Sequence, residues 1–313
     1  MLRSLEKRAP SLYIGPKPKV KKNGGIRYVY DTKAPLKPLL KKINTTFFKQ
    51  VYFPPYLTGS LAGNDFITNA AIHKGAKQAF TEDITKFFDN ITSHHVYRIW
   101  HDFFGFSDEV ASLLTNLTTR EGRVFQGTPT SSYLANLAFW DREPALVERL
   151  SQKGIRYSRY VDDLTMSSTD ALSAEDKTWL ISQVYGMIGA AGFKPQRAKH
   201  DSLPASRPIK IMGLNANSKS QPSLPKKERA NIQAQVYQIE RRQASGESGP
   251  ELRSAIAQAI GRVSKMKRLH GREAEPLSAR LRKVSELLSS TLLVTQSVVS
   301  GATNPAPSDE PPF

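Results

Sequence analysis

The chain has 313 residues, no cysteine and a formal net charge of +17, and 39% of its residues are hydrophobic. That length can bury a sizeable core, whereas the absence of cysteine excludes disulfides, thiol nucleophiles and cysteine-ligated zinc. No apolar run reaches the length of a transmembrane helix, and the first ten residues have no apolar signal-peptide core. We therefore expect a cytoplasmic protein with no membrane partner.

The positive charge is concentrated towards the two ends of the chain. Residues 1–50 carry 13 Lys or Arg against 2 Asp or Glu, and residues 190–290 carry 20 against 8, whereas residues 51–189 carry 12 against 16. Two basic flanks favour a polyanionic partner such as nucleic acid. An acidic centre between them fits a polymerase, although basic residues that merely keep the surface soluble are the plainer alternative.

The first half of the chain predicts a hairpin, a strand and several helices. Residues 17–31 predict a hairpin that turns at Asn23, Gly24 and Gly25, and residues 78–84 predict a strand that ends in carboxylates. Ser93 is the expected N-cap of one helix, and Pro144 is expected to kink another. Apolar periodicity predicts these helices over residues 33–51, 93–104, 107–117 and 130–150.

The second half predicts two strands around an aspartate pair, followed by charged helices. Residues 155–161 and 164–168 flank Asp162-Asp163 as strands joined by a tight turn. A helix closed by Gly192 and a short strand are predicted next, over residues 174–191 and 209–214. Three charged helices then cover residues 226–242, 250–269 and 275–293. The uneven alternation of strands and helices predicts an α+β fold, and the proline-rich residues 301–313 predict a disordered tail.

Asp162 and Asp163 are the first candidates for chemistry. Two adjacent carboxylates at a turn repel one another, and a divalent cation is the usual reason to tolerate them. A bare Asp-Asp pair is more often an ordinary exposed turn. Its setting in Tyr160-Val-Asp-Asp-Leu164 makes the signal far more specific.

Asp83 is the second candidate, because it closes the strand predicted over residues 78–84. Phosphoryl transfer on two metal ions needs carboxylates from separate elements, and neighbouring antiparallel strands could bring Asp83 to Asp162. Glu82 should point to the opposite face of the strand and is not expected to be a ligand. Asp89 is expected to be a turn or cap residue.

Several segments in one order carry a resemblance to the reverse transcriptases of bacterial retrons. Residues 83–91 resemble that family's first catalytic motif, an aspartate followed by paired aromatics, and residues 160–163 match its catalytic box. Residues 125–131 resemble its Gln-Gly motif, residues 192–199 a helix-end motif, and residues 212–214 the primer grip. With residues 21–27 the match covers about residues 17–216.

The resemblance implies a right-hand polymerase with an antiparallel palm sheet. Fingers and palm would occupy residues 1–221, and a basic helical thumb residues 222–300. Two Mg2+ ions, or Mn2+ in their place, would be bound by Asp83 and Asp162 with support from Asp163. The backbone carbonyl of Ile84 would complete one coordination shell.

The resemblance also implies a deoxynucleotide site. Arg27 would bind triphosphate oxygens, Gln126 and Gly127 would line the pocket, and Lys199 would give a proton to the leaving pyrophosphate. Phe88 would be a steric gate whose ring fills the space that a ribose 2′-hydroxyl needs. Alone, Phe88 is equally well a core aromatic, and Arg27 and Lys199 are solvated cations.

Two elements bear on RNA. Asn69 and His73 match the retron pattern Asn-Ala-x-x-His and should share one face of a short helix; the alternative is a satisfied helix histidine. Met212, Gly213 and Leu214 would contact the primer. The chain departs from the retron pattern at Ile211-Met-Gly213, where Val-Thr-Gly is usual, and at Phe125, where proline is usual.

The basic helices after residue 225 would grip a duplex backbone. Their candidate contacts are cations near the helix ends: Arg241, Arg242, Lys265, Lys267 and Arg268. The resemblance implies a structured non-coding RNA as template and primer, a branched RNA–DNA product and antiphage defence with a separate effector protein.

Other functions stay open at this point. The chain could be another bacterial reverse transcriptase, from an abortive-infection system, a group II intron or a diversity-generating element. It could also be an RNA-binding scaffold that has lost catalysis, although all three carboxylates are present. An RNA-directed RNA polymerase is disfavoured by the bulky gate expected at Phe88.

Overall fold

The fold is that of a computed structural model, which describes the backbone of residues 2–20, 24–204, 206–218 and 220–301. The side chains of residue 199 and residues 290–301 are not described. The chain divides into two compact units, Met1–Pro222 and Ser223–Phe313. The predicted turn residue Asn23 and residues 302–313 of the tail predicted to be disordered over 301–313 lie outside the described residues, whereas Gly301 ends a helix.

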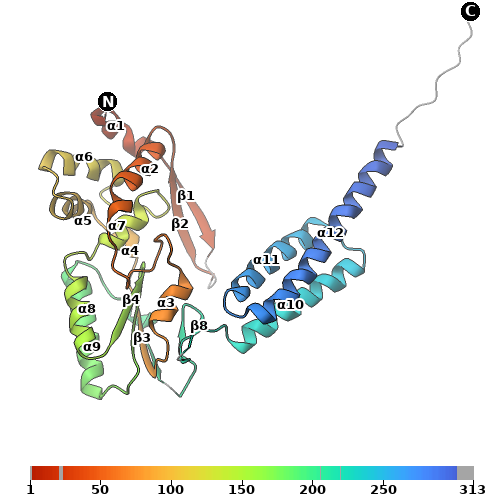
Figure 1. Ribbon diagram of the computed structural model, residues 1–313. Coiled ribbons are helices and arrows are strands. Elements are labelled where there is room, and N and C mark those ends of the chain that lie inside the picture. Colours follow the sequence, from red (N-terminus) through yellow and green to blue (C-terminus); the bar gives the residue numbers. More distant parts are fainter. Residues whose placement is uncertain (1, 21–23, 205, 219, 302–313) are drawn as a thin grey trace, which may run out of the picture. The chain divides into compact units, whose positions relative to one another are not determined.

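The first unit mixes helices and strands, as predicted (Figure 1). Its helices are α1 (Leu2–Arg8), α2 (Leu36–Thr46), α3 (Phe66–Ile72), α4 (Phe87–Asn90), α5 (Ser93–Arg98), α6 (Asp108–Thr118), α7 (Ser131–Leu137), α8 (Glu143–Gln152) and α9 (Ala174–Ala190). Its strands are β1 (Tyr13–Val20), β2 (Ile26–Thr32), β3 (Gln78–Asp83), β4 (Arg156–Tyr160), β5 (Asp163–Ser168), β6 (Asp201–Pro204), β7 (Lys210–Ile211) and β8 (Leu214–Asn215).

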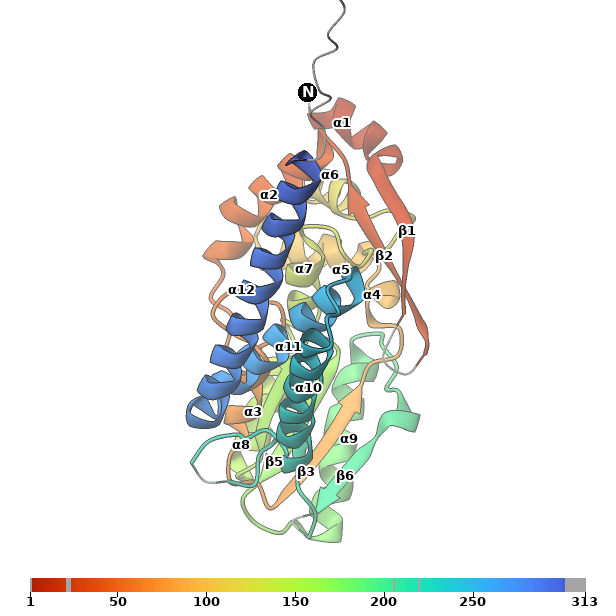
Figure 2. The same ribbon diagram turned by 90° about the vertical axis from the view of Figure 1, so that its right-hand side faces the viewer.

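A four-stranded antiparallel sheet in the order β4-β5-β3-β6 organises this unit. Figure 2 shows β5, β3 and β6 side by side. In Figure 1, α8 and α9 lie on one side of the sheet and α3 on the other. The register places Asp83 opposite Asp163, so the strand predicted to end in carboxylates meets the aspartate pair at one end of the sheet.

The core of this unit contains many aromatic side chains. Trp100, Phe48 and Phe139 are fully buried, and the rings of Phe48 and Trp100 lie 5.0 Å apart. Aromatic side chains bury large apolar areas, and tilted pairs of this kind add to that stabilisation. The helix predicted over residues 33–51 from apolar periodicity is α2, and it buries Leu36, Leu40 and Ile43.

Hairpin β1–β2 confirms the first predicted element. Its strands pair from Tyr13 with Thr32 to Val20 with Ile26, with an irregularity between Ile14 and Lys17. The far part of the hairpin is exposed: Val20 is 80% exposed and Tyr28 54%. The hairpin therefore projects from the core rather than covering it.

Three predicted elements differ from the structure. The single helix expected over residues 130–150 is two helices, α7 and α8, and Pro144 lies in the first turn of α8, where its missing N–H costs little. The strand expected over residues 209–214 is the two-residue hairpin β7–β8, turned by Met212 and Gly213 with positive φ. Thr92, not Ser93, caps α5.

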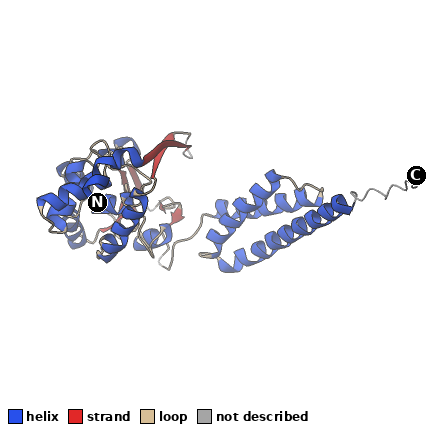
Figure 3. Cartoon of the chain, turned by 90° about the horizontal axis from the view of Figure 1, so that it is seen from above, coloured by secondary structure: helices blue, strands red, loops and turns tan. Residues whose placement is uncertain are grey.

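The second unit contains α10 (Lys226–Ala244), α11 (Pro250–Lys267) and α12 (Gly271–Gly301), and no strand in its described residues (Figure 3). The helices bury apolar faces against one another, with Val236, Ile256 and Leu281 among the buried residues. Arg280 Nε donates to Glu240 Oε1 at 2.7 Å, which ties α12 to α10. Within the described part of the chain, no helix has both the length and the hydropathy needed to cross a bilayer.

Candidate active site

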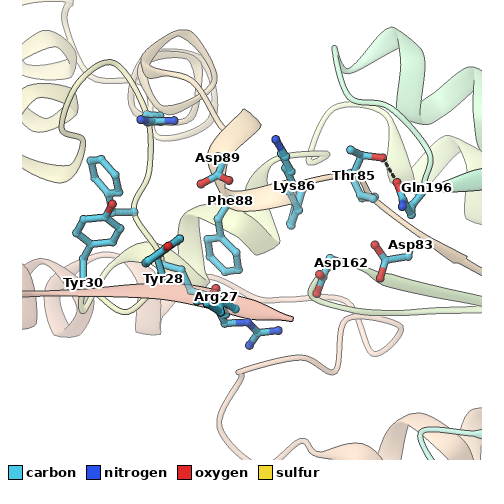
Figure 4. A pocket seen from close by; sticks show the side chains of 16 residues that line it. Arg27, Tyr28, Tyr30, Asp83, Thr85, Lys86, Phe88, Asp89, Asp162 and Gln196 are labelled. Atoms are coloured by element: carbon cyan, nitrogen blue, oxygen red, sulfur yellow. Dashed lines mark hydrogen bonds between the residues drawn. The ribbon is translucent and has the colours of Figure 1, made fainter. Parts of the chain in front are cut away.

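A cavity of about 680 Å3 lies in the first unit. Its walls come from β2, the end of β3, the segment leading into α4, and the segment before α7. Figure 4 shows Asp83 and Asp162 at one end of this cavity and Tyr30 at the other. Segments far apart in the sequence therefore converge on one space.

Two carboxylates, Asp83 and Asp162, line the cavity from adjacent strand ends. The Ile84 backbone N–H donates to the Asp162 carbonyl at 3.2 Å, which fixes the two segments against each other. Asp163, although it is opposite Asp83 in the sheet, is not among the lining residues. The prediction that Asp83 and Asp162 would meet is confirmed.

This donor set suits a hard divalent cation. Mg2+ prefers oxygen ligands, is usually bound by one or two carboxylates plus substrate phosphates, and keeps several waters. Among the described residues no group of three or more His, Asp, Glu or Cys could hold a metal ion. The pair Asp83 and Asp162 therefore fits a metal that substrate phosphates help to bind, rather than a closed all-protein site.

The candidate nucleotide residues are brought together in part. Arg27, Phe88 and Gln126 all line the cavity. Gly127 does not: its φ is +108°, and a Cβ there would lie 2.5 Å from the Tyr30 carbonyl oxygen. The expected pocket-lining role of Gly127 is thus corrected to a close approach between its loop and β2. The side chain of Lys199 lies outside the described residues.

Glu82 faces away from the cavity, as predicted. Its side chain is buried, and it accepts a hydrogen bond from the Tyr185 hydroxyl at 3.4 Å and contacts His200 Nδ1. Asp89 was expected to be a turn or cap residue, but it lies within α4 and lines the cavity.

Sequence reasoning missed several lining residues, among them Tyr28, Tyr30, Lys86, Arg123 and Gln196. Gln196 accepts a hydrogen bond from the Thr85 hydroxyl at 2.8 Å and donates from its backbone to the Asp83 carbonyl at 2.7 Å. Arg123 lies 5.3 Å over the Phe125 ring. The available signals were position in a motif for Lys86 and Gln196, and proximity to Gln126 in the chain for Arg123.

Asn69 and His73 occupy a buried polar network instead of an RNA-binding surface. Asn69 is 1% exposed and His73 0%. His73 Nε2 and Asn69 Nδ2 both contact the Ser158 hydroxyl, at 2.7 and 3.1 Å, and His73 Nδ1 contacts Ser167 Oγ at 2.7 Å. Burial lowers the pKa of His73 to about 3, so the ring is neutral. The two residues share one partner, as predicted, but direct RNA contact was wrong because neither side chain reaches the surface.

The segment Met212–Leu214 is divided in exposure. Gly213 is exposed and Met212 half-buried at the tip of hairpin β7–β8, whereas Leu214 is fully buried. The predicted primer contact of the Leu214 side chain is therefore wrong, since the core covers it. Contact of Met212 and Gly213 with the primer remains a prediction.

The predicted RNA-binding cations of the second unit lie on α10, on α11 and just after α11. Arg241 is exposed. Three others form ion pairs: Arg242 with Glu247, Lys265 with Glu228 at 3.3 Å, and Lys267 with Glu275 at 2.7 Å. Arg268 follows the last residue of α11. Their contact with RNA remains a prediction.

Comparisons with known proteins identify relatives of this chain. No protein-family model matches the chain. The retron Se72 reverse transcriptase of Salmonella heidelberg (strain 579083-10) is 35% identical over 266 residues, covering 84% of this chain and 70% of that protein. The retron Ec48 reverse transcriptase of Escherichia coli is 30% identical over 279 residues, covering 85% and 68%.

A solved structure gives a likeness of fold alone. Apo telomerase from Candida tropicalis superimposes with a TM-score of 0.51 at 9% identity, over 90% of this chain. The matched region spans 58% of that telomerase chain.

Proposed function

The chain belongs to the retron reverse transcriptases, which are RNA-directed DNA polymerases, and from that premise we propose that it copies part of a structured non-coding RNA into DNA. The reaction would be nucleotidyl transfer from deoxynucleoside triphosphates, with Asp83 and Asp162 as the metal-binding carboxylates. The alternative is another bacterial reverse-transcriptase activity on the same site.

One observation carries the proposal: Asp83 and Asp162 line the same cavity as Arg27 and Phe88. Carboxylates, a guanidinium and an aromatic wall are what a metal-bound deoxynucleotide needs for its phosphates and its sugar. Asp163, paired with Asp83 across the sheet, would hold the two strand ends together when metal binds.

Bound divalent metal would lower the pKa of the primer hydroxyl and stabilise the charge on phosphorus. Asp83 and Asp162 would hold it, with the Ile84 carbonyl as a further ligand. Arg27 would orient the triphosphate, and Phe88 would exclude a ribose 2′-hydroxyl. Lys199 would give a proton to the leaving pyrophosphate.

We propose that the second unit is the thumb and that residues 1–221 form fingers and palm. Cations such as Arg241 would contact the duplex backbone, and Met212 and Gly213 would contact the primer. A role in antiphage defence, with a separate effector protein, extends this proposal from the family.

Replacing Asp162 tests the site. Asp162→Asn keeps the shape of the side chain and removes the charge. Loss of a residue that only supports a metal ligand costs about 10–100-fold. Loss of the ligand itself should therefore lower primer extension on an RNA template with Mg2+ by more than about 100-fold. The unfolding temperature should change little.

Asp170→Asn is the matched control, since Asp170 is an exposed carboxylate just beyond the other end of β5. It should extend primers like the wild type. Activity that survives Asp162→Asn would exclude the carboxylate from the metal site.

The product can be examined separately. Nucleic acid that co-purifies with the protein from its native host should contain RNA joined to DNA through a 2′-linked branch. The branch is detected by comparing samples with and without debranching treatment. DNA without a branch, or an absence of DNA, would contradict the proposal and favour one of the alternatives.

A further inference from the structure

We propose that Arg159 and Glu143 form a positioning device that holds the turn between β4 and β5 in the shape that presents Asp162. This turn, residues 160–163, is called here the aspartate turn. The inference rests on the proposed function, because it concerns how the same carboxylate is aimed.

The pair is buried and bidentate. The Arg159 side chain is 0% exposed and the Glu143 side chain 2%. Arg159 Nε donates to Glu143 Oε1 at 2.6 Å and Nη2 donates to Oε2 at 2.8 Å. Tyr157 adds a hydroxyl bond to Oε1 at 2.6 Å. Glu143 is the first residue of α8, so the carboxylate anchors the guanidinium from outside the sheet.

One further donor of Arg159 reaches the aspartate turn itself, and another reaches the end of α7. Nη1 donates to the Val161 carbonyl oxygen at 3.0 Å, and Nη2 also donates to the Asn136 carbonyl at 2.8 Å. The Val161 carbonyl belongs to the peptide that enters Asp162. A planar guanidinium has its donors in a rigid fork, so fixing one edge on Glu143 fixes the direction of the other.

The turn needs such support because its backbone is strained. Val161 has φ +62°, a left-handed conformation that is costly for a β-branched residue and persists only where the surroundings enforce it. Residues in this state are found where a precise geometry is used.

A second wall closes on the turn from the segment before α3. A Cβ on Gly59 would lie 2.4 Å from the Val161 nitrogen, so only glycine fits there. The Asn136 side chain donates to the Gly59 carbonyl at 2.9 Å. Asn136 thus accepts from Arg159 and holds Gly59, and the strained residue Val161 is enclosed from both sides.

Stability alone does not account for the pair. Removing two charges from water is expensive, and well-packed apolar replacements of a buried pair are often as stable or more so. What an apolar pair cannot do is donate to the Val161 carbonyl. The two explanations therefore predict different behaviour for an apolar replacement.

The test uses the full chain carrying Arg159→Met, Glu143→Leu and Tyr157→Phe together, which leaves neither a buried charge nor the Tyr157 hydroxyl without its partner. The unfolding temperature should be close to or above that of the wild type. The turnover number in primer extension should fall by about 100-fold, the loss expected when reacting groups are displaced by about 1 Å. The KM for primer–template should hardly change.

A readout independent of catalysis separates this inference from the proposed function. Amide hydrogen exchange of a peptide spanning residues 160–163 should accelerate at least about tenfold in the triple variant, and should not change in Tyr157→Phe, the matched control. Unchanged exchange at the turn in a folded triple variant would overturn the inference. A wild type that makes no DNA, with exchange altered as expected, would instead overturn the proposed function alone.

Arg159→Lys is the second variant if the triple variant fails to fold. A lysine keeps the charge opposite Glu143 but has no fork with which to reach Val161 as well. Accelerated exchange at the aspartate turn supports the inference, and wild-type exchange with wild-type turnover contradicts it.

Discussion

At the scale of single residues, Phe88 is the side chain that we propose selects the sugar of the substrate. It lies in α4, half-buried, and its ring centroid is 6.0 Å from that of Phe87, which belongs to the buried core. A ring held by the core on one side and open to the cavity on the other is a fixed wall. Removing it should admit a substrate that carries one more oxygen.

Phe88→Ala should therefore raise ribonucleotide incorporation relative to deoxynucleotide incorporation by about 10–100-fold, the range over which a pocket separates substrates that differ in one small group. The measurement is the ratio of kcat/KM values for a ribonucleotide and its deoxy counterpart. Tyr52→Ala, at an aromatic residue 84% exposed and away from the cavity, should leave that ratio unchanged. A ratio that does not move in Phe88→Ala would remove the gate assignment.

Residue types indicate the centre of the candidate site, but not its rim. Asp83, Asp162 and Phe88 stand in motifs whose spacing implies their use. Arg123 enters the cavity only because the segment between α6 and α7, distant in the chain from β3, folds towards it. The path of such a segment does not follow from local periodicity. Which residues pair across the sheet depends on the order of the strands, and that order is likewise set by tertiary structure.

At the scale of elements, polar contacts join α3 and the residue after it to the sheet. His73 bridges Ser158 of β4 and Ser167 of β5 through its two ring nitrogens. The spacing of Asn69 and His73 predicted that they share a face, but helical period cannot say whether that face meets solvent or a sheet. Only the packing of α3 on β4 settles it.

The burial of His73 makes stability depend on pH. Its folded-state pKa, about 3, lies below the value near 6.5 of an unfolded histidine. The contribution of neutral His73 to the free energy of unfolding is complete above pH 6.5. It is lost as the pH falls towards 3, because the unfolded chain binds the proton first. The loss is at most about 1.4 kcal/mol per pH unit.

Denaturant unfolding at pH 7.5 and 5 should therefore show a larger drop for the wild type than for His73→Asn. His94→Asn, at an exposed histidine on α5, should keep the wild-type drop. Equal drops in all three proteins would mean that His73 titrates normally in the folded state.

Helix breaks were harder to foresee than helices. The apolar pattern of residues 130–150 continues through the break between α7 and α8, so periodicity predicted one helix. A proline signals a first turn as well as a kink, and the two uses are distinguished only by where the preceding helix ends.

At the scale of the whole molecule, charge is divided between units. The second unit is helical and basic, and several of its cations are already neutralised by acidic neighbours on adjacent helices or turns. Formal charge counts from the sequence overstate what such a surface offers to phosphates. Arg241 is exposed and has no ion-pair partner among the described residues, so its charge is available to contribute.

Arg241→Gln should weaken binding of an RNA–DNA duplex and reduce the slope of log Kd against log salt concentration by about one. Lys267→Gln is the comparison, since the Glu275 carboxylate 2.7 Å away already balances that charge. Its slope should change less. Equal slopes for Arg241→Gln and the wild type would place the duplex elsewhere.

The close approach of Gly127 to Tyr30 bears on how polymerases of this kind could be adapted to unnatural nucleotides. The Tyr30 backbone N–H donates to the Gln126 carbonyl at 2.8 Å, so the wall at this point is main chain against main chain. In a random library that varies position 127, most variants would carry a side chain that prevents this contact from forming. Tyr28 and Arg123 have side chains that border the same cavity. At these positions, selection could change the substrate range without disturbing the contact between hairpin β1–β2 and the segment at Gly127.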